Sequence, residues 1–489
     1  MFPSAPVAPP VVDNTPPPLV VDLDGTLVHT DMLHESTLRL CRQAPLAALR
    51  IPLWMMRGKA FSKQQIAQRT RLDTSLLPYD QTLLSWLHAQ RQGGRQLVLC
   101  TASDRTIACD VAAHCQLFDE VLASDGGLNL KGEHKARALV QRFGSQGFDY
   151  VGDAMADLPV WSAARQGIVT NATQATIDRA QEAGHIAQVL SPRRTSLSSW
   201  WGALRVHHWT KNLLLFVALV AAHQIDDLQA WMRLALAFAA FSLCASSVYI
   251  ANDLLDLEHD RRHPRKRDRP FASGALSIGQ GVLLMPLLAL AALALAWSVG
   301  PAFMVWLCGY LALTWLYSCW LKRLAVVDCL ILAGLYMMRV VAGAAAVDVE
   351  LSFWLLAFSG FLFLSLAFVK RYAELLLPEA AADSKLHGRG YVAADAASIQ
   401  LFGVAAGYCA VLVLGLYLNS ETVVRLYATP ELVWGTVPVV LFWISWIWLR
   451  ASRGEMHDDP LVFAFRDKAS LVAAALFGMA LVLGSWTFP

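Results

Sequence analysis

The spacing of hydrophobic and polar positions divides the chain near residue 200. Before that point, short apolar runs rich in Val and Leu alternate with longer polar stretches, which is typical of parallel strands joined by helices. After Trp200, apolar runs of about 20 residues are separated by charged loops, and a helix of that length crosses a bilayer. The pattern therefore predicts an N-terminal α/β domain with a parallel sheet and a C-terminal all-α membrane bundle.

The membrane half contains nine candidate transmembrane helices. They lie at roughly 209–224, 230–250, 278–298, 301–320, 326–346, 352–370, 398–418, 432–450 and 469–487. With a cytosolic N-terminus, the cytosolic loops hold sixteen Lys and Arg residues, whereas the four opposite loops hold one, Arg425. This asymmetry predicts a multi-pass protein of the bacterial inner membrane, with a cytosolic N-terminal domain and a periplasmic C-terminus.

The composition agrees with this division. Hydrophobic residues make up 56% and charged residues 16% of the chain, whereas soluble domains carry about 25% charged residues. The net charge of +2 gives no reason to expect a nucleic-acid partner, and the nine cysteines show no metal-ligand spacing. We interpret the Pro-rich residues 1–17 as a flexible leader rather than a signal peptide. We expect domains at 18–190 and 206–489, joined by a linker at 191–205.

Four short segments of the first domain place polar residues at or near the ends of predicted strands. They are VVDLDGTLV (20–28, with Asp22 and Asp24), QLVLCTASD (96–104, with Thr101), LKGEHKARAL (130–139, with Lys135) and YVGDAMADLPV (150–160, with Asp153 and Asp157). Residues i and i+2 of a strand face the same side, so the first segment presents two carboxylates together. Parallel sheets bind ligands at the carboxyl ends of their strands, and we expect one site there.

This ordered set resembles the haloacid dehalogenase (HAD) phosphatase family over about residues 18–190. The resemblance implies that Asp22 is the nucleophile that forms an aspartyl-phosphate, with Asp24 as the general acid and base. It also implies that Thr101 and Lys135 hold the phosphoryl oxygens. An HAD domain is expected to have a Rossmann-like parallel sheet with helices on both faces.

The same resemblance implies a Mg²⁺ site built from carboxylate oxygens. Its candidate ligands are Asp22, Asp24, Asp153 and Asp157. Lys131 is a weaker candidate for the position given to Lys135.

The stretch between the first two segments, about 30–90, is longer than a simple crossover needs. It predicts a helical cap with Trp54, Met55 and Met56 on an apolar face, and a cap of this kind closes the site and selects the substrate. The alternative interpretation is a domain that keeps the fold but has lost catalysis, and that regulates or scaffolds the membrane half.

An ordered set of acids follows the second candidate span, in ANDLLDLEHDRRHPRKRDRPFASG (251–274). Asn252, Asp256 and Asp260 are spaced at i, i+4 and i+8, so they share one helix face, and Asp253 lies beside them. These acids repel one another unless a cation neutralises them. Mg²⁺ suits such ligands, because it prefers a few carboxylates together with substrate phosphates.

The basic residues after this acidic face are candidates for binding phosphate. They are Arg261, Arg262, Lys266 and Arg269. Their alternative interpretation is an ordinary basic loop on the cytosolic side of the membrane.

The pattern NDxxDxxxD followed by RPxASG resembles the UbiA superfamily over roughly residues 200–487. The resemblance implies that the first motif binds Mg²⁺ and the diphosphate of a donor substrate. Most members carry a second motif with two aspartates after the fourth span, whereas the corresponding segment here has one acid, Asp328. This departure weakens the expectation of a prenyl-diphosphate donor.

Further segments resemble a narrower branch, the decaprenyl-phosphate phosphoribosyltransferases. They are HHWTKN with Lys211, YSCWLK with Tyr317 and Lys322, Arg339 with Gly343, FVKRYAEL with Lys370, Arg371 and Glu374, and the loop segments HGRGY and DDPLVFAFRDK. This branch implies phosphoribosyl diphosphate (PRPP) as the donor and a polyprenyl phosphate as the acceptor. The basic residues among them are then candidates for binding the ribose 5-phosphate or the lipid phosphate.

Together these patterns predict a phosphoribosyl transferase fused to a phosphatase, and our hypothesis is that the phosphatase removes the 5-phosphate from the transferase product. The alternative for the fusion is that the phosphatase acts on some other small phosphate and that the fusion reflects coexpression only. One alternative is a prenyltransferase that joins a prenyl diphosphate to an aromatic or other acceptor. A second alternative, from another class, is a transporter or channel with a regulatory HAD domain. A homo-oligomer is compatible with the sequence, which leaves the lipid chain length open.

Overall fold

The computed structural model describes residues 16–192, 196–222, 224, 226–376, 389–420, 427–456 and 459–485. Most of the predicted leader, Arg425 and parts of the HGRGY and DDPLVFAFRDK segments lie outside these ranges. The chain divides into two compact units. The first comprises Met1–Ala203 and Ile250–Leu284, and the second comprises Leu204–Tyr249 and Met285–Pro489.

A six-stranded, all-parallel sheet forms the centre of the first unit, in the order β3-β2-β1-β4-β5-β6. Its strands are β1 (Leu19–Val21), β2 (Leu97–Asp104), β3 (Glu120–Ser124), β4 (Asp149–Gly152), β5 (Gln166–Ala172) and β6 (Ile186–Pro192). Val20 of β1 is in register with Val98 of β2 on one side and Tyr150 of β4 on the other. The strand order reverses at β1, so a ligand crevice is expected beside its carboxyl end.

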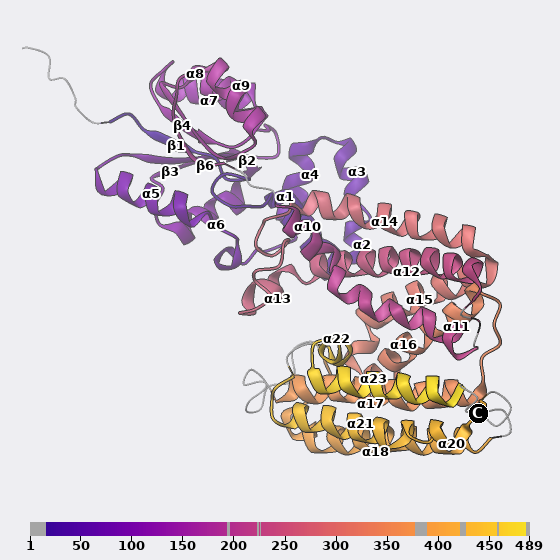
Figure 1. Ribbon diagram of the computed structural model, residues 1–489. Coiled ribbons are helices and arrows are strands. Elements are labelled where there is room, and N and C mark those ends of the chain that lie inside the picture. Colours follow the sequence, from indigo (N-terminus) through magenta and orange to yellow (C-terminus); the bar gives the residue numbers. More distant parts are fainter. Residues whose placement is uncertain are drawn as a thin grey trace, which may run out of the picture. The chain divides into compact units, whose positions relative to one another are not determined.

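Helices cover both faces of this sheet (Figure 1), as the apolar runs predict. Alternate residues of β1 enter different cores: Leu19 and Val21 pack with α5 (Gln81–Gln92) and α6 (Arg105–Cys115), whereas Val20 enters the opposite core. The opposite layer consists of α7 (Glu133–Phe143), α8 (Leu158–Ala163) and α9 (Gln174–Ala183). The fold is the predicted Rossmann-like α/β sandwich.

The segment predicted to form a cap is helical. It contains α1 (Met32–Gln43), α2 (Pro45–Ala48), α3 (Ile51–Met56), α4 (Lys59–Ala67) and the 3-10 turn η1 (Thr74–Leu76), followed by α5 on the sheet. Trp54 is buried in a small core with Leu40 and Ile66. Met55 and Met56 point outward and are 53% and 84% exposed. The prediction that Trp54, Met55 and Met56 share one apolar face is therefore wrong, because Trp54 packs in the core and the two methionines do not.

Eight helices among the described residues are long and apolar enough to cross a membrane. They are α12 (Leu228–Leu255), α14 (Ile278–Val299), α15 (Pro301–Cys319), α16 (Val327–Ala346), α17 (Phe353–Leu375), α18 (Ala396–Leu418, with the preceding η6, Ala393–Asp395), α21 (Thr436–Ser452, with the preceding α20, Pro430–Val433) and α23 (Lys468–Ser485). Shorter elements are α10 (Leu197–Leu204), α13 (Leu257–Arg262), η4 (Leu321–Arg323) and α22 (Pro460–Ala464). The protein is a multi-pass membrane protein.

The first of the nine expected spans, 209–224, is not a long α-helix. The structure has a 3-10 segment, η3 (Val206–Phe216), followed by the short α11 (Val217–Ala221). A 3-10 helix rises about 2.0 Å per residue and an α-helix about 1.5 Å, so the two together extend about 30 Å, close to the thickness of a hydrocarbon core. This segment is therefore not among the eight candidate spans of the described residues, and it buries the polar side chains of Lys211 and Asn212.

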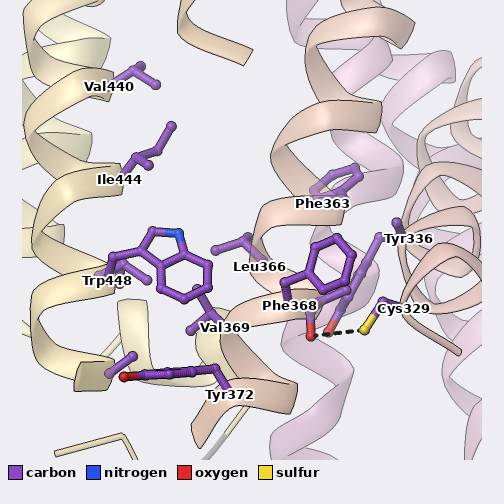
Figure 2. Close-up of a cluster of buried hydrophobic side chains, with 14 of the residues drawn as sticks. Cys329, Tyr336, Phe363, Leu366, Phe368, Val369, Tyr372, Val440, Ile444 and Trp448 are labelled. Carbon is purple, nitrogen blue, oxygen red and sulfur yellow. Dashed lines mark hydrogen bonds between the residues drawn. The ribbon is translucent and has the colours of Figure 1, made fainter. Parts of the chain in front are cut away.

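The larger core of the second unit lies among α16, α17, α18 and α21 (Figure 2). In Figure 2, Trp448 and Ile444 of α21 face Leu366 and Val369 of α17. Helix α18 meets this pair closely, because a Cβ on Gly403 would lie 2.2 Å from the Trp448 ring. Small residues let membrane helices approach in this way.

A second core joins η3 and α11 to α12, α14, α15 and α16. Helix α16 serves both cores, with Tyr336 and Val340 in the larger and Leu335 and Ala342 in the smaller. Gly343 of α16 faces the backbone of η3, where a Cβ would lie 2.0 Å from the Leu215 carbonyl oxygen. Only glycine fits this contact.

Candidate functional site

Three carboxylates of the first unit meet at the carboxyl ends of neighbouring strands. Asp22 follows β1, Asp153 follows β4, and Asp157 ends the 3-10 turn η2 (Met155–Asp157). Among the described residues, they form the group whose ligand oxygens all lie within 4.8 Å of one another, as a metal site requires. Gly25 makes room for Asp153, because a Cβ at its φ of +79° would lie 2.3 Å from the Asp153 carboxylate.

The ammonium of Lys135 lies against the same acids. Its Nζ is 2.8 Å from Asp22 Oδ2 and 3.6 Å from Asp157 Oδ1, and it lies 2.9 Å from the hydroxyl of Tyr150. Tyr150 in turn donates to Asp157 at 2.7 Å. Burial opposes the charge of Lys135, but Asp22 and Asp157 outweigh it and raise the lysine pKa above its usual range.

These acids carry more negative charge than one lysine balances. Burial raises the pKa of Asp22 to about 7, against the opposing effect of Lys135. Burial also raises the pKa of Asp153 well above its usual range, and Asp157 and Asp22 add to that effect. A divalent cation with oxygen ligands would offset this cost, so the residues present fit Mg²⁺.

Asp24 has different surroundings and lies outside this group of three. Its carboxylate accepts hydrogen bonds from Met32 N at 2.7 Å, Ser103 Oγ at 2.6 Å and Thr101 Oγ1 at 3.3 Å. Burial raises the pKa of Asp24, partly against these hydrogen bonds, which favours a carboxyl group that can hold a proton. Thr101 is fully buried beneath Asp24, and the sequence reasoning missed Ser103, which lies two residues further along β2.

A cavity of about 600 Å³ opens over these groups. Asp22, Asp24, Lys135, Asp153 and Asp157 line it, and so does Lys131, the weaker of the two predicted lysines. Lys63 also lines it and donates to the Ala102 carbonyl at 2.6 Å. The loop after the aspartate-rich segment closes part of the wall with Ser273, Gly274, Ala275 and Ser277.

The aspartate-rich segment keeps its expected face. Asp256 N donates to the Asn252 carbonyl at 2.9 Å, and Asp260 N donates to the Asp256 carbonyl at 2.9 Å, so the i, i+4 spacing continues from α12 into α13. Arg269 joins two of the acids, with Nη1 at 3.2 Å from Asp253 and 2.7 Å from Asp260. Burial raises the pKa of Asp260, and Arg269 partly offsets it.

The basic residues predicted to bind phosphate lie in two different surroundings. Arg269 lies on the acidic face, and Lys266 lies half-buried in the same loop. Arg262 instead pairs with Asp73 of η1 at 3.0 Å, and Arg261 forms a buried pair with Glu35 of α1 at 2.6 Å. These two arginines therefore bind the HAD cap in this structure, and a phosphate role for Arg262 stays a prediction.

In the second unit, Asp328 is fully buried in an ion-pair network. Arg371 Nη2 lies 2.6 Å from its Oδ2, Arg389 Nη1 lies 3.3 Å away, and the Tyr391 hydroxyl donates to Oδ1 at 2.5 Å. Glu374 pairs with both arginines. Asp328, Arg371 and Glu374 are thus partners in one ion-pair network, and their predicted role in substrate binding stays a prediction.

Tyr317 and Lys322 lie near the end of α15 and in η4. Arg389 donates to the Tyr317 hydroxyl at 3.3 Å, and Lys322 is half-buried. Arg389 and Tyr391 of the HGRGY segment complete the Asp328 network, and the sequence had predicted no role for either residue.

Asp459 is a buried acid to which the sequence reasoning gave no role. Lys211 Nζ lies 2.7 Å from its Oδ2, Lys370 Nζ lies at 3.2 Å, and the Tyr336 hydroxyl donates at 2.9 Å. Burial opposes the charge of Asp459, but the two lysines outweigh it and lower the pKa of the acid. The available signal was the Asp-Pro pair that begins α22, where Asp459 caps Leu461 N at 3.3 Å.

Arg339 is buried in α16 among neutral partners. Its Nε donates to Asn212 Oδ1 at 2.9 Å and its Nη2 to the Tyr310 hydroxyl at 2.9 Å. Its guanidinium also lies over the Tyr310 ring, 4.8 Å from the centroid. An arginine in these surroundings retains its charge and is suited to binding an anion.

The sequence model of the UbiA prenyltransferase family matches residues 213–468, more than half of the chain. The chain belongs to the UbiA prenyltransferase family. Residues 19–162 match the model for haloacid dehalogenase-like hydrolases, and the N-terminal part of this UbiA-family protein is an HAD-like domain.

Three relatives differ in how much of the chain they share. An uncharacterized protein of Sinorhizobium fredii is 36% identical over 95% of this chain and 90% of its own length. The nodulation protein NoeC of Azorhizobium caulinodans is 40% identical over 58% of this chain and 91% of its own. The decaprenyl-phosphate phosphoribosyltransferase of Mycolicibacterium smegmatis is 37% identical over 38% of this chain. The matched region covers 60% of that enzyme's length. The first relative therefore shares both halves of this UbiA-family chain.

Proposed function

We propose that the membrane half transfers 5-phosphoribose from PRPP to a polyprenyl phosphate and releases diphosphate. We propose further that the HAD-like domain then removes the 5-phosphate of the lipid-linked product. In the first step a phosphate oxygen of the lipid attacks the anomeric carbon, and the bond from that carbon to the diphosphate breaks.

The state of Asp328 is the observation that favours this donor. The acid has no exposed surface, its charge is already balanced by Arg371 and Arg389, and the Tyr391 hydroxyl donates to it. It is therefore poorly suited to bind the metal that a second aspartate-rich motif would hold for a prenyl diphosphate. The partial match to decaprenyl-phosphate phosphoribosyltransferases supports the same donor.

The acidic face of α12 and α13 supports a site for the leaving diphosphate. Asn252, Asp253, Asp256 and Asp260 would hold Mg²⁺, which would neutralise the diphosphate as it departs. Arg269 already bridges Asp253 and Asp260, so a cation is compatible with this face. In the proposal, the carboxylates of Asp253 and Asp260 would hold the metal and Arg269 would bind the diphosphate oxygens.

The other phosphate groups need cations of their own. Lys211 and Lys370 both pair with the same carboxylate, Asp459, and Arg339 donates to the neutral side chains of Asn212 and Tyr310. These cations therefore retain capacity for an anion. We assign Lys211, Lys370 and Arg339 to the lipid phosphate or the ribose 5-phosphate, on the cytosolic side of the membrane.

The HAD-like site supports phosphate removal through a covalent step. The Asp22 carboxylate attacks phosphorus, Asp24 donates its proton to the departing sugar oxygen, and Asp24 then takes a proton from the water that hydrolyses the aspartyl-phosphate. Lys135, at 2.8 Å from Asp22, would hold the phosphoryl oxygens. Mg²⁺ on Asp22 and Asp153 would offset the charge that gathers there.

The test follows ribose label from PRPP into lipid. Purified full-length protein receives Mg²⁺, radiolabelled PRPP and a polyprenyl phosphate, and the lipid is extracted. We expect lipid-borne label with the wild type and its loss with Asp256→Asn. Asp268→Asn is the matched control, because Asp268 is an exposed acid of the same loop.

The phosphatase step is read from the same extract. We expect Asp22→Asn to leave the 5-phosphate on the lipid product, whereas Asp110→Asn, an exposed acid on α6, should not. If no label enters lipid across several chain lengths, the phosphoribosyl proposal fails. Label transfer from a prenyl diphosphate to an aromatic acceptor would then establish the alternative that the family name suggests.

A further inference from the structure

The cap of the HAD-like domain presents a row of apolar side chains to the outside. Leu46, Leu49, Leu53 and Met56 are 80%, 74%, 62% and 84% exposed. Their spacing of three, four and three residues follows one face of a helix. The backbone stays right-handed helical through Leu49 and Arg50, so α2 and α3 keep nearly continuous faces across their junction.

The opposite face of the same helices already has its partners. Ala44, Ala47, Ala48 and Ile51 pack beside Trp54 on the small core formed with α1 and α4. The segment formed by α2 and α3 is therefore apolar on both sides, and only its inner side packs on this core. A helix with a second apolar face needs a second apolar environment.

The charge around this outer row has one sign. Between Glu35 and Asp73 the chain has eight Lys and Arg residues and no acid. The exposed cations nearest the row are Arg42, Arg50, Arg57 and Lys59. Apolar residues flanked by cations characterise segments that lie in the interface of an anionic membrane.

The position of the row within the first unit favours the same environment. Arg42 and Gln43, the last residues of α1, line a small cavity with Leu254 and Leu255, the last residues of α12. Helix α12 is a candidate membrane span that ends at Leu255. Helix α2 begins two residues after Gln43, so the outer row starts beside the membrane-surface end of a spanning helix.

We propose that α2 and α3 form a membrane-surface anchor, whose outer row inserts into the headgroup region of the cytosolic leaflet while its cations bind anionic lipid. The anchor holds the cap at the surface where a lipid-borne phosphate would be presented. The anchor would hold the cap at the membrane whichever reactions the two sites catalyse.

The test places a photo-crosslinking residue on the row. Full-length protein with p-benzoylphenylalanine in place of Leu53 is reconstituted into nanodiscs of phosphatidylcholine with phosphatidylglycerol, irradiated and analysed by mass spectrometry. We expect lipid adducts at this position and none at the matched control, Gln181, an exposed position on α9. Removing phosphatidylglycerol should reduce the yield.

A variant with acidic residues in the row distinguishes insertion from chance proximity. In the Leu53-labelled protein, Leu49→Glu with Met56→Glu should lower the lipid adduct at least about tenfold, since it replaces apolar contact with repulsion from anionic lipid. Val189→Glu, an exposed apolar position on β6, should leave the yield unchanged. Unaltered hydrolysis of soluble p-nitrophenyl phosphate by the double variant would show that the domain remains folded.

The outcomes that overturn the proposal are distinct. An absence of lipid adducts at position 53, or the same yield in the double variant, would exclude insertion. A crosslink to a second copy of the chain would assign the row to a protein interface instead. Neither result would bear on phosphoribosyl transfer, which is measured separately.

Discussion

Gly274 lies in the loop that closes part of the cavity of the HAD-like domain. Gly274 has a φ of +79°, and a Cβ there would lie 2.4 Å from His29 Cβ and 2.5 Å from the His29 carbonyl oxygen. Both residues line the cavity above Asp22. Gly274→Ala therefore combines left-handed backbone strain with a steric overlap against backbone that cannot rotate away.

Gly94 separates these two effects. Its φ is +78°, it lies in the same unit, and a Cβ there would meet nothing within 4 Å. Left-handed strain should cost both alanine variants about 1 to 2 kcal/mol. The overlap should cost Gly274→Ala a further 1 to 3 kcal/mol, roughly.

The assay is thermal unfolding of the full-length protein in detergent, together with the KM for p-nitrophenyl phosphate. Each kcal/mol should lower the midpoint by about 2 to 4 °C for a unit of this size. We expect the lower midpoint and a several-fold higher KM for Gly274→Ala, because displaced His29 narrows the cavity. Equal midpoints and equal KM values for the two variants would refute the assignment of this loop to the cavity wall.

Three further results are expected. Lys135→Met removes the cation beside Asp22, so it should abolish phosphate hydrolysis and leave lipid labelling intact. It should also destabilise the first unit by about 3 kcal/mol. Unchanged hydrolysis would contradict the proposed role of Lys135 in holding the phosphoryl oxygens. Asp459→Asn leaves the buried Lys211 and the half-buried Lys370 without this carboxylate, and it should lower the unfolding midpoint. Adding Lys211→Met should recover part of that loss in a double-mutant cycle, and strictly additive losses would show that the pair is not coupled. Chelation with EDTA should stop both activities, and added Mg²⁺ should restore them. Mg²⁺ should also raise the unfolding midpoint, because a ligand that binds only the folded state stabilises it. An unfolding midpoint that does not change with Mg²⁺ would argue against the carboxylate site.

The two-part architecture could be predicted because both signals are local. Strand residues alternate between two buried faces, and the apolar runs of the second half have the length of a bilayer crossing. The segment 209–224 shows the limit of that reasoning, since a 3-10 helix reaches the same length with fewer residues. The type of helix depends on the hydrogen bonds of the buried polar groups, and the number of apolar residues in a segment does not predict it.

The meeting of the strand-end carboxylates in the first unit could be predicted for a related reason. Asp22 and Asp153 follow β1 and β4, and neighbouring parallel strands end at the same edge of a sheet. Asp24 differs in its surroundings, because Ser103 of β2 reaches it from 79 residues away in the chain. The end of a strand determines the backbone position of a residue, but the hydrogen-bond partners of its side chain come from other elements.

The sequence by itself therefore determined the fold class, the membrane-spanning half, the strand-end acids and the acidic face of α12 and α13, because each depends on spacing within one element. Only the tertiary structure decided which charges are already paired. Arg261 reaches Glu35 across 226 residues, and Asp328 binds Arg371 and Arg389 from two other segments. Whether a cation binds a substrate or a carboxylate depends on such distant contacts, whose free energy arises from burial and charge in the folded chain.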